Sequence, residues 1–247
     1  MNLEKCLTLS KDDLIFEIEK IKGIKTKSMS WLLQNKPALT NPSVCFVSHI
    51  DTYNDVLYEY NNKLIYHDEK RGVYWSPGGL GADDRAGVYA CLQMYHQFFH
   101  SNYPISILFC DYEENGGQGA KQSCQSFKNE LSNVLFFIEF DRQEKNDCVF
   151  YNNESNHFKK WIESFGFYES IGSFSDISIL GKFFKKVSVN LSTGFFNEHS
   201  EAEYLIELYL LDTIKKASEI LKMYKEFDKK WKINPMLKKW DLKSFYH

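Results

Sequence analysis

Several stretches of the chain are nearly continuous in hydrophobic residues and stop at acidic residues. Residues 44–52, 104–111 and 134–142 have this pattern, which is typical of strands that are buried on both faces of a sheet. Residues 186–191 predict a further strand, and residues 63–67 read as a hairpin-like patch. The strands supply the frame of the predicted fold.

Other stretches have apolar residues at helical spacing. Helices are therefore predicted between these strands, together with a loop followed by a strand over residues 173–180. The predicted helices cover residues 11–22, 28–34, 83 to about 100, 119 to about 128, 157–165 and 201 to about 227.

Alternating strands and helices predict an α/β fold, a three-layer α/β/α sandwich with a mostly parallel mixed sheet. A chain of 247 residues fits one such domain. Residues 228–247 contain six lysines and two tryptophans, and we interpret them as a solvated tail. Ligands of such folds bind beyond the carboxyl ends of the strands, so the acidic strand ends mark the expected site.

The net charge of −3 limits the classes of partner, and the scattered cysteines indicate the compartment. A chain without a basic excess is not expected to bind nucleic acid or an anionic membrane surface. Six cysteines without CxxC pairing indicate reduced thiols, and there is no signal-like or membrane-spanning apolar run. We expect a cytoplasmic protein, and the sequence leaves its oligomeric state open.

A glycine-rich turn at residues 76–87 delivers Asp83 and Asp84 to the start of a predicted helix. Taken alone, two acids at a helix start are explained by capping. A nucleotide-binding loop is a weaker alternative, because Asp84 stands where a third glycine would follow Gly79 and Gly81. Carboxylates on a glycine turn also suit a divalent cation.

The strand ends and this turn together bring too many acids to one edge for a structural cluster. Buried carboxylates of like charge cost several kcal/mol each unless protons or cations neutralise them, so two divalent cations are predicted here. The residues at this edge are His49, Asp51, Asp83, Asp84, Glu113, Glu114, Glu139, Asp141 and His199.

Five ordered motifs between residues 49 and 203 resemble those of the co-catalytic di-zinc exopeptidases. This superfamily includes peptidase T, carboxypeptidase G-type enzymes and the aminopeptidase Y relatives, and the resemblance implies a phosphorylase/hydrolase-like fold. The motifs are His49-Ile50-Asp51, Gly81-Ala82-Asp83-Asp84-Arg85-Ala86-Gly87, Asp111-Tyr112-Glu113-Glu114-Asn115-Gly116-Gly117, Phe140-Asp141-Arg142 and His199-Ser200-Glu201-Ala202-Glu203.

The resemblance implies two zinc ions, or ions such as Co²⁺ or Mn²⁺, with Glu113 as the general base acting on a water between them. Asp51, on the same strand face as His49, would accept the second ring N–H of that histidine. The implied ligands are His49, Asp83 and Asp141 for one ion, and Asp83, Glu114 and His199 for the other.

Some assignments stay open at this stage. Glu139 and Asp141 are two residues apart on one strand and face the same side, and the motif favours Asp141 as the ligand. Asp84 is expected at the helix N-terminus. Arg142 and Asp176 are candidates for substrate binding, and a structural role for Asp176 is an equal alternative.

Asp141 and His199 are only 58 positions apart, and this interval already has to hold a helix and about two strands. An added lid domain of about 50 residues or more is therefore not expected there. A lone catalytic domain with an open pocket predicts an aminopeptidase acting on short peptides. The alternatives are an N-deacylase or other amidohydrolase with the same metal site, and a catalytically silent metal-binding interaction domain. Loops around residues 74–81, 116–119 and 192–198 should shape the pocket, with Tyr112, Phe174, Phe195 and Phe196 as candidate walls.

Overall fold

The structure is a computed structural model that describes residues 1–36, 42–53 and 63–223. The predicted tail, residues 228–247, lies outside the described residues, as do the last residues of the helix that we expected to end near position 227. Within the described ranges, no helix is long and apolar enough to cross a membrane.

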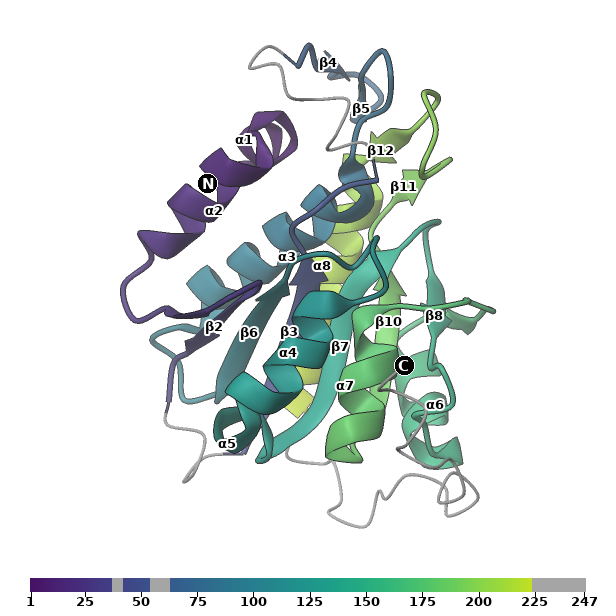
Figure 1. The fold of residues 1–247 in the computed structure, drawn as a ribbon. Helices are drawn as coiled ribbons and strands as arrows, with labels where there is room; N and C mark the ends of the chain where they lie inside the picture. The colour runs from purple at the N-terminus through teal and green to yellow at the C-terminus, as the bar shows by residue number, and fades with distance from the viewer. Residues whose placement is uncertain (37–41, 54–62, 224–247) are drawn as a thin grey trace.

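An eight-stranded mixed sheet forms the centre of the molecule, in the order β1-β2-β6-β3-β7-β10-β8-β9 (Figure 1). The four central strands β6, β3, β7 and β10 run parallel, which confirms the predicted mostly parallel sheet. The strands are β1 (Lys25–Lys27), β2 (Ser30–Gln34), β3 (Ser43–His49), β6 (Ile105–Cys110), β7 (Val134–Arg142), β8 (Asp147–Val149), β9 (Tyr168–Glu169) and β10 (Ser188–Ser192).

Helices cover both faces of this sheet (Figure 1). In β3, Val44 and Phe46 belong to one hydrophobic cluster while Cys45 and Val47 belong to the other, which is why the strand is apolar at every position. The first cluster contains residues of α1 (Leu3–Thr8), α2 (Lys11–Glu19), α3 (Ala82–Phe98), α6 (Asn156–Glu163) and α8 (Glu207–Met223), and the second contains residues of α4 (Gln118–Ser126), α5 (Lys128–Leu131) and α7 (Asp176–Phe184).

A second, smaller antiparallel sheet lies above the ends of the central strands, in the order β11-β12-β5-β4 (Figure 1). Its β4–β5 pair confirms the hairpin-like patch. The sheet joins the segment just before Asp83 to the segment around His199. The strands are β4 (Tyr66–Asp68), β5 (Val73–Trp75), β11 (Phe195–Phe196) and β12 (Tyr204–Ile206).

Two of the predicted elements were wrong. Within the helix predicted over residues 28–34, Ser30–Gln34 form strand β2 instead, because Trp31, Leu32 and Leu33 are buried and β2 pairs antiparallel with β6. The strand predicted within residues 173–180 is the start of helix α7, and the loop before it ends at Ser175. Both are short apolar runs, whose period does not separate helix from strand.

The long C-terminal helix also begins later than expected. Residues Tyr204–Ile206 form β12, which pairs with β5 and β11, and α8 starts at Glu207. The pairing partner β5 is more than a hundred residues away in sequence, so no local pattern reveals it.

The topology creates a crevice at the carboxyl ends of the central strands. From β3 the chain passes to β6 on one side, and from β6 it returns to β7 on the other side of β3. Ligands of α/β proteins bind at such a reversal of strand order. Between Asp141 and His199 the chain forms β8, α6, β9, α7, β10 and β11.

Candidate metal centre

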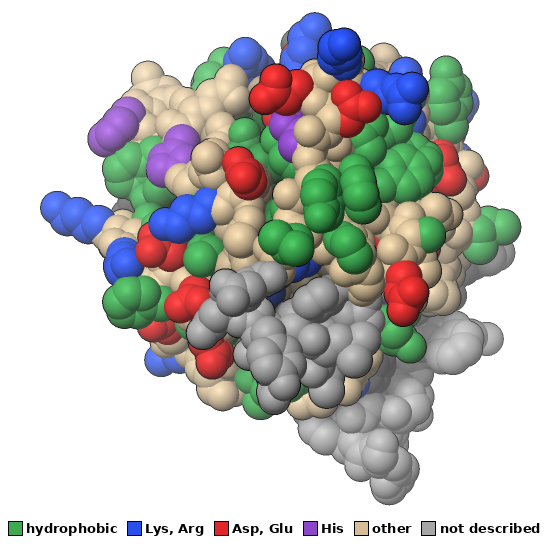
Figure 2. Space-filling view, turned by 90° about the horizontal axis from the view of Figure 1, so that it is seen from above, with side chains coloured by type: hydrophobic (Ala, Val, Ile, Leu, Met, Phe, Trp, Pro, Cys, Tyr) green, Lys and Arg blue, Asp and Glu red, His purple; other side chains and the backbone are tan. Residues whose placement is uncertain are grey.

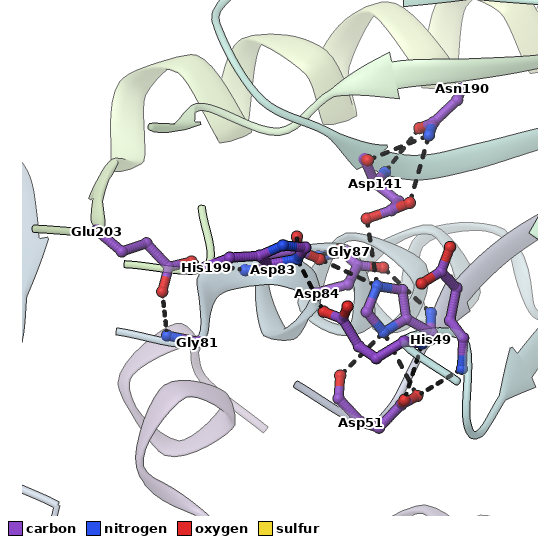
Figure 3. Close-up of polar contacts among 12 residues, drawn as sticks. His49, Asp51, Gly81, Asp83, Asp84, Gly87, Asp141, Asn190, His199 and Glu203 are labelled. Carbon is purple, nitrogen blue, oxygen red and sulfur yellow. Dashed lines mark hydrogen bonds and ion pairs between the residues drawn. The ribbon is translucent and has the colours of Figure 1, made fainter. Parts of the chain in front are cut away.

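His49 ends β3 and is almost fully buried at this crevice. Its Nδ1 lies 2.9 Å from the main-chain oxygen of Asp51, and since a carbonyl only accepts, Nδ1 carries a proton and donates. The other ring nitrogen, Nε2, lies 3.0 Å from Oδ1 of Asp83 and 3.3 Å from Oδ1 of Asp141. The ring is therefore oriented with Nε2 toward two carboxylates (Figure 3).

Asp83 contacts both histidines through different oxygens (Figure 3). Its Oδ1 faces His49, and its Oδ2 lies 3.1 Å from Nε2 of His199. That same His199 nitrogen is 3.0 Å from Oε1 of Glu114. The five predicted ligands thus form two sets that share Asp83.

The carboxylates of this cluster differ in the direction in which their surroundings shift the pKa. The contacts with His199 and His49 outweigh burial and lower the pKa of Asp83. Burial and the nearby Asp83 carboxylate raise the pKa of Asp141 to about 7, although His49 opposes the shift. Carboxylates held this close repel one another, and a bound cation would stabilise them. Their crowding therefore indicates that these residues suit a metal ion.

The kinds of side-chain atom and their spacing also suit a metal ion. Groups of imidazole and carboxylate atoms within 4.8 Å of one another are formed by His49, Asp83 and Glu114, and by His49, Asp84 and Asp141. Oε1 of Glu114 is buried and accepts no hydrogen bond from the described residues, despite its closeness to His199. Two imidazoles and bridging carboxylates are ligands that suit zinc.

Asp51 acts differently from the prediction. Its carboxylate Oδ1 is 3.5 Å from Nδ1 of His49, so the nearer acceptor of that ring N–H is the Asp51 main-chain oxygen. The carboxylate instead accepts the main-chain N–H groups of Glu113, at 3.1 Å, and Glu114, at 3.2 Å. Asp51 therefore connects the β3 end to the loop that carries both glutamates.

Glu113 lies at the cavity surface beside these ligands. Burial, followed by repulsion from Asp141, Asp83 and Glu114, raises its pKa to about 8 even though His49 lowers it. Within the described part of the chain, neither His49 nor His199 donates a hydrogen bond to it. A carboxylate next to the ligands with its proton affinity raised has the properties of a general base.

Asp84 lies close to His49 and Asp141, but both Asp84 and Glu139 accept hydrogen bonds from main-chain N–H groups. Asp84 accepts the main-chain N–H of His49 at 3.2 Å and of Gly87 at 2.9 Å, so it braces the strand end as well as the helix start. The bond that joins it to Asp83 is a cis peptide. Oε2 of Glu139 accepts the main-chain N–H of Ile177 at 3.3 Å, and this geometry favours Asp141 as the ligand.

Two residues that sequence reasoning missed position the ligands (Figure 3). Glu203 accepts the main-chain N–H of Asp83 at 3.0 Å and that of Gly81. The side-chain oxygen of Asn190 accepts the N–H of Asp141 at 2.9 Å, and its amide donates to the Asp141 carbonyl at 3.1 Å. Glu203 lay within a recognised motif, but Asn190 lay in a predicted strand with no distinguishing signal.

A cavity of about 360 Å³ opens beside the predicted metal ligands. Seen from above the strand ends, this face of the molecule gathers hydrophobic side chains next to acidic ones (Figure 2). Phe174 and Phe195 line the cavity as expected, but Tyr112 and Phe196 are not among its lining residues. The lining is formed by Asp83, Glu113, Glu114, Gly116, Asp141, Arg142, Gln143, Tyr151, Gly172, Ser173, Phe174, Phe195, Glu198 and His199.

The two substrate-binding candidates have different places. Arg142 lines the cavity, whereas Asp176 does not and is fully buried at the start of α7. The position of Asp176 favours the structural alternative.

Comparison with known proteins identifies the family of this chain. The model of peptidase family M28 matches residues 32–170, more than half of the chain. The chain therefore belongs to peptidase family M28. The matched stretch contains four of the five predicted ligands and Glu113, and His199 lies beyond it. No curated protein matches the chain in sequence.

Solved peptidase structures share the fold at low sequence identity. Aminopeptidase PepT from Bacillus cereus superposes with a TM-score of 0.65 at 13% identity, covering 89% of this chain and 96% of its own. A tripeptidase from Staphylococcus aureus gives 0.67 at 14% identity, with 90% and 96% covered. The TET1 peptidase of Pyrococcus horikoshii gives 0.66 at 13%, with 89% and 98% covered. The predicted α/β fold is thereby confirmed.

Proposed function

We propose that this chain is a two-zinc aminopeptidase that removes residues from short peptides. The observation that carries the proposal is the sharing of Asp83, whose two oxygens lie 3.0 and 3.1 Å from the Nε2 atoms of two separate histidines. A carboxylate between two imidazoles is the arrangement that two neighbouring cations require. M28 membership supports hydrolysis of peptide bonds.

Each ion has a ligand set in the proposal. Zinc bound there would polarise the substrate carbonyl and lower the pKa of a water molecule. The sets are His49, Asp83 and Asp141 for one ion, and Asp83, Glu114 and His199 for the other.

Glu113 is the proposed proton carrier. It lines the cavity next to Asp83 and Asp141, close to where the scissile bond would lie. As the base it takes a proton from the attacking water, and as the acid it then returns that proton to the leaving amine nitrogen. Asp51 holds the two main-chain N–H groups of the glutamate loop, so its role is to position Glu113 and Glu114.

The preference for short peptides rests on the size and construction of the pocket. Its volume of about 360 Å³ is at the small end of ligand pockets, which span about 300–1,000 Å³. The elements between Asp141 and His199 belong to, or pack on, the sheets already described, consistent with a lone catalytic domain. Two of the similar structures are named an aminopeptidase and a tripeptidase.

The free state of all six cysteines favours a reducing compartment, which supports the proposed cytoplasmic location.

Metal analysis combined with a substrate screen tests the proposal. Protein reconstituted with zinc should hold about two ions per chain and release the first residue of unblocked di- and tripeptides. A metal content near zero would contradict the metalloenzyme. Hydrolysis confined to N-acyl amino acids, or to N-blocked peptides with a free carboxyl end, would replace the aminopeptidase by a deacylase or a carboxypeptidase with the same site.

A further inference from the structure

Apart from His199, the charged side chains that the described residues contribute to the cavity lining are carboxylates with one exception, Arg142. Among its lining residues, Arg142 is the sole lysine or arginine from the described part of the chain, whereas Asp83, Glu113, Glu114, Asp141 and Glu198 are all acids. The proposed zinc ions account for the acids near Asp83. They give no reason for a guanidinium in the same cavity.

Arg142 has weak partners within the described ranges. Its Nη2 donates to Oγ of Ser170 at 3.5 Å and lies 3.8 Å from Oδ2 of Asp147. Its Nε is buried and has no hydrogen-bond partner among the described residues. Guanidinium–carboxylate pairs usually have short, often bidentate contacts of about 2.7–2.9 Å. The donors of Arg142 are therefore poorly satisfied, and a buried unsatisfied donor is costly.

The backbone of Arg142 is nevertheless held firmly. Its main-chain oxygen accepts the N–H of Thr193 at 2.8 Å, and the residue ends strand β7 directly after Asp141. A side chain one residue beyond a metal ligand, on a rigid strand, lies close to the bond that would be cleaved. Such a position suits recognition of a group on the substrate.

We infer that Arg142 binds a carboxylate of the substrate and makes this enzyme selective for peptides with a negative charge near the scissile bond. The inference rests on the proposed peptidase function. Two donors of Arg142, Nε and Nη2, form the edge of the guanidinium that can hold a carboxylate with two parallel hydrogen bonds. The carboxylate belongs either to an acidic first residue or to the C-terminus of a very short peptide.

Four substrates separate these two sources. Alanine p-nitroanilide has no carboxylate, and glutamate p-nitroanilide has one on its side chain. Trialanine has one at its C-terminus, and trialanine amide has none. Wild-type kcat/KM should be higher for one or both carboxylate-bearing substrates than for the neutral member of the same pair.

Replacing Arg142 with Met keeps an unbranched, flexible side chain and removes its charge and its hydrogen-bond donors. We expect kcat/KM for the preferred carboxylate-bearing substrate to fall about 10- to 100-fold, the effect of a lost charged hydrogen bond, while the neutral substrates change less than about threefold. Arg142→Lys should restore part of the selectivity, because it keeps the charge without the fork. Lys145→Met is the matched control, since Lys145 lies over the Tyr209 ring and outside the cavity lining.

Binding measured by calorimetry keeps the inference separate from the proposed function. Zinc-loaded Glu113→Gln protein should bind trialanine or free glutamate more tightly than trialanine amide or alanine amide, and Arg142→Met added to it should abolish that difference. If the wild type hydrolyses none of the four substrates, the proposed function fails while this binding difference still tests Arg142. Equal losses on all four substrates, or no charge preference in binding, would overturn the role of Arg142. Should Arg142→Met not fold, the Arg142→Lys variant is compared with the wild type on the same carboxylate-bearing and neutral substrates. A partial loss of selectivity for the carboxylate would support the role of Arg142, and unchanged selectivity would contradict it.

Discussion

The two histidines of the proposed metal centre lie in contrasting environments. His49 is held at the end of a central strand, with 1% of its side chain exposed, whereas 41% of the His199 side chain is exposed. His199 lies in a loop and has a positive φ of 58°, while His49 has extended strand geometry. Both face Asp83, so one shared carboxylate joins a rigid buried half to an open half.

The support behind each half differs in the same way. The main chain of His49 donates to Asp84, and its ring donates to the Asp51 carbonyl. Behind His199, by contrast, the described contact is the stacked ring of Tyr53, at a centroid distance of 4.5 Å. We expect the buried half to bind its ion tightly and the open half to exchange its ion, because ligands held by second contacts lose less order on binding.

The largest expected effect comes from removing the proposed general base, which acts between the two halves. Glu113→Gln should lower kcat about 10²- to 10⁴-fold, because a glutamine cannot take the proton. Zinc content should remain near two per chain, measured by elemental analysis. Retention of full activity would show that another group is the base, and loss of zinc would show that Glu113 is a ligand.

Exchanging the two histidines for alanine tests the contrast directly. His199→Ala should keep one tight zinc ion and weaken the other at least about 100-fold, more than the loss of a supporting contact would do. His49→Ala should weaken both and lower the melting temperature, because it strips a buried group from Asp83 and Asp141. Zinc titration and thermal melting measure the two effects. If zinc titration gave the same affinities for both variants, the proposed difference between the two halves would be wrong.

Glu203 links the two halves, since it follows the His199 loop and accepts the N–H groups of Gly81 and Asp83. Glu203→Ala should lower zinc affinity about 10- to 100-fold, as outer contacts of metal sites do, while KM changes little. Glu203→Gln keeps one oxygen acceptor and should restore part of the affinity.

The matched control for this pair is Glu201→Gln. Glu201 is exposed in the same loop, and its change should leave zinc affinity unaltered. A glutamine variant as poor as the alanine variant in zinc affinity would contradict a hydrogen-bonding role for Glu203.

The smallest expected effect concerns the ring that supports the open half. Tyr53→Leu removes the stacking on His199, which is worth about 0.5–1.5 kcal/mol for an aromatic pair. Release of the first zinc ion to a chelator should become about 2- to 10-fold faster, as followed by a zinc-sensitive dye. Release of the second ion should stay unchanged, and acceleration of both would place Tyr53 behind the whole centre.

Local sequence features were sufficient for the frame of this protein. The apolar runs that became β3, β6 and β7 are buried on both faces, so their composition alone predicted parallel central strands. The parallel direction then placed their acidic ends at one edge. The position of His49, Glu114 and Asp141 at this edge could therefore be predicted from the sequence.

The relations between distant segments were decided by the tertiary structure. β2 and β12 exist because they pair with β6 and β5, and a three- to five-residue strand has too few residues to show its own period. Glu139 and Asp141 face the same side of their strand, and the structure favours Asp141 as the ligand because Glu139 accepts the N–H of Ile177 in α7. Glu203 and Asn190 are ordinary polar residues in sequence. They become positioning groups because long-range pairing brings them within hydrogen-bond distance of Asp83 and Asp141, and such contacts are specified by the packed fold rather than by any segment of the chain.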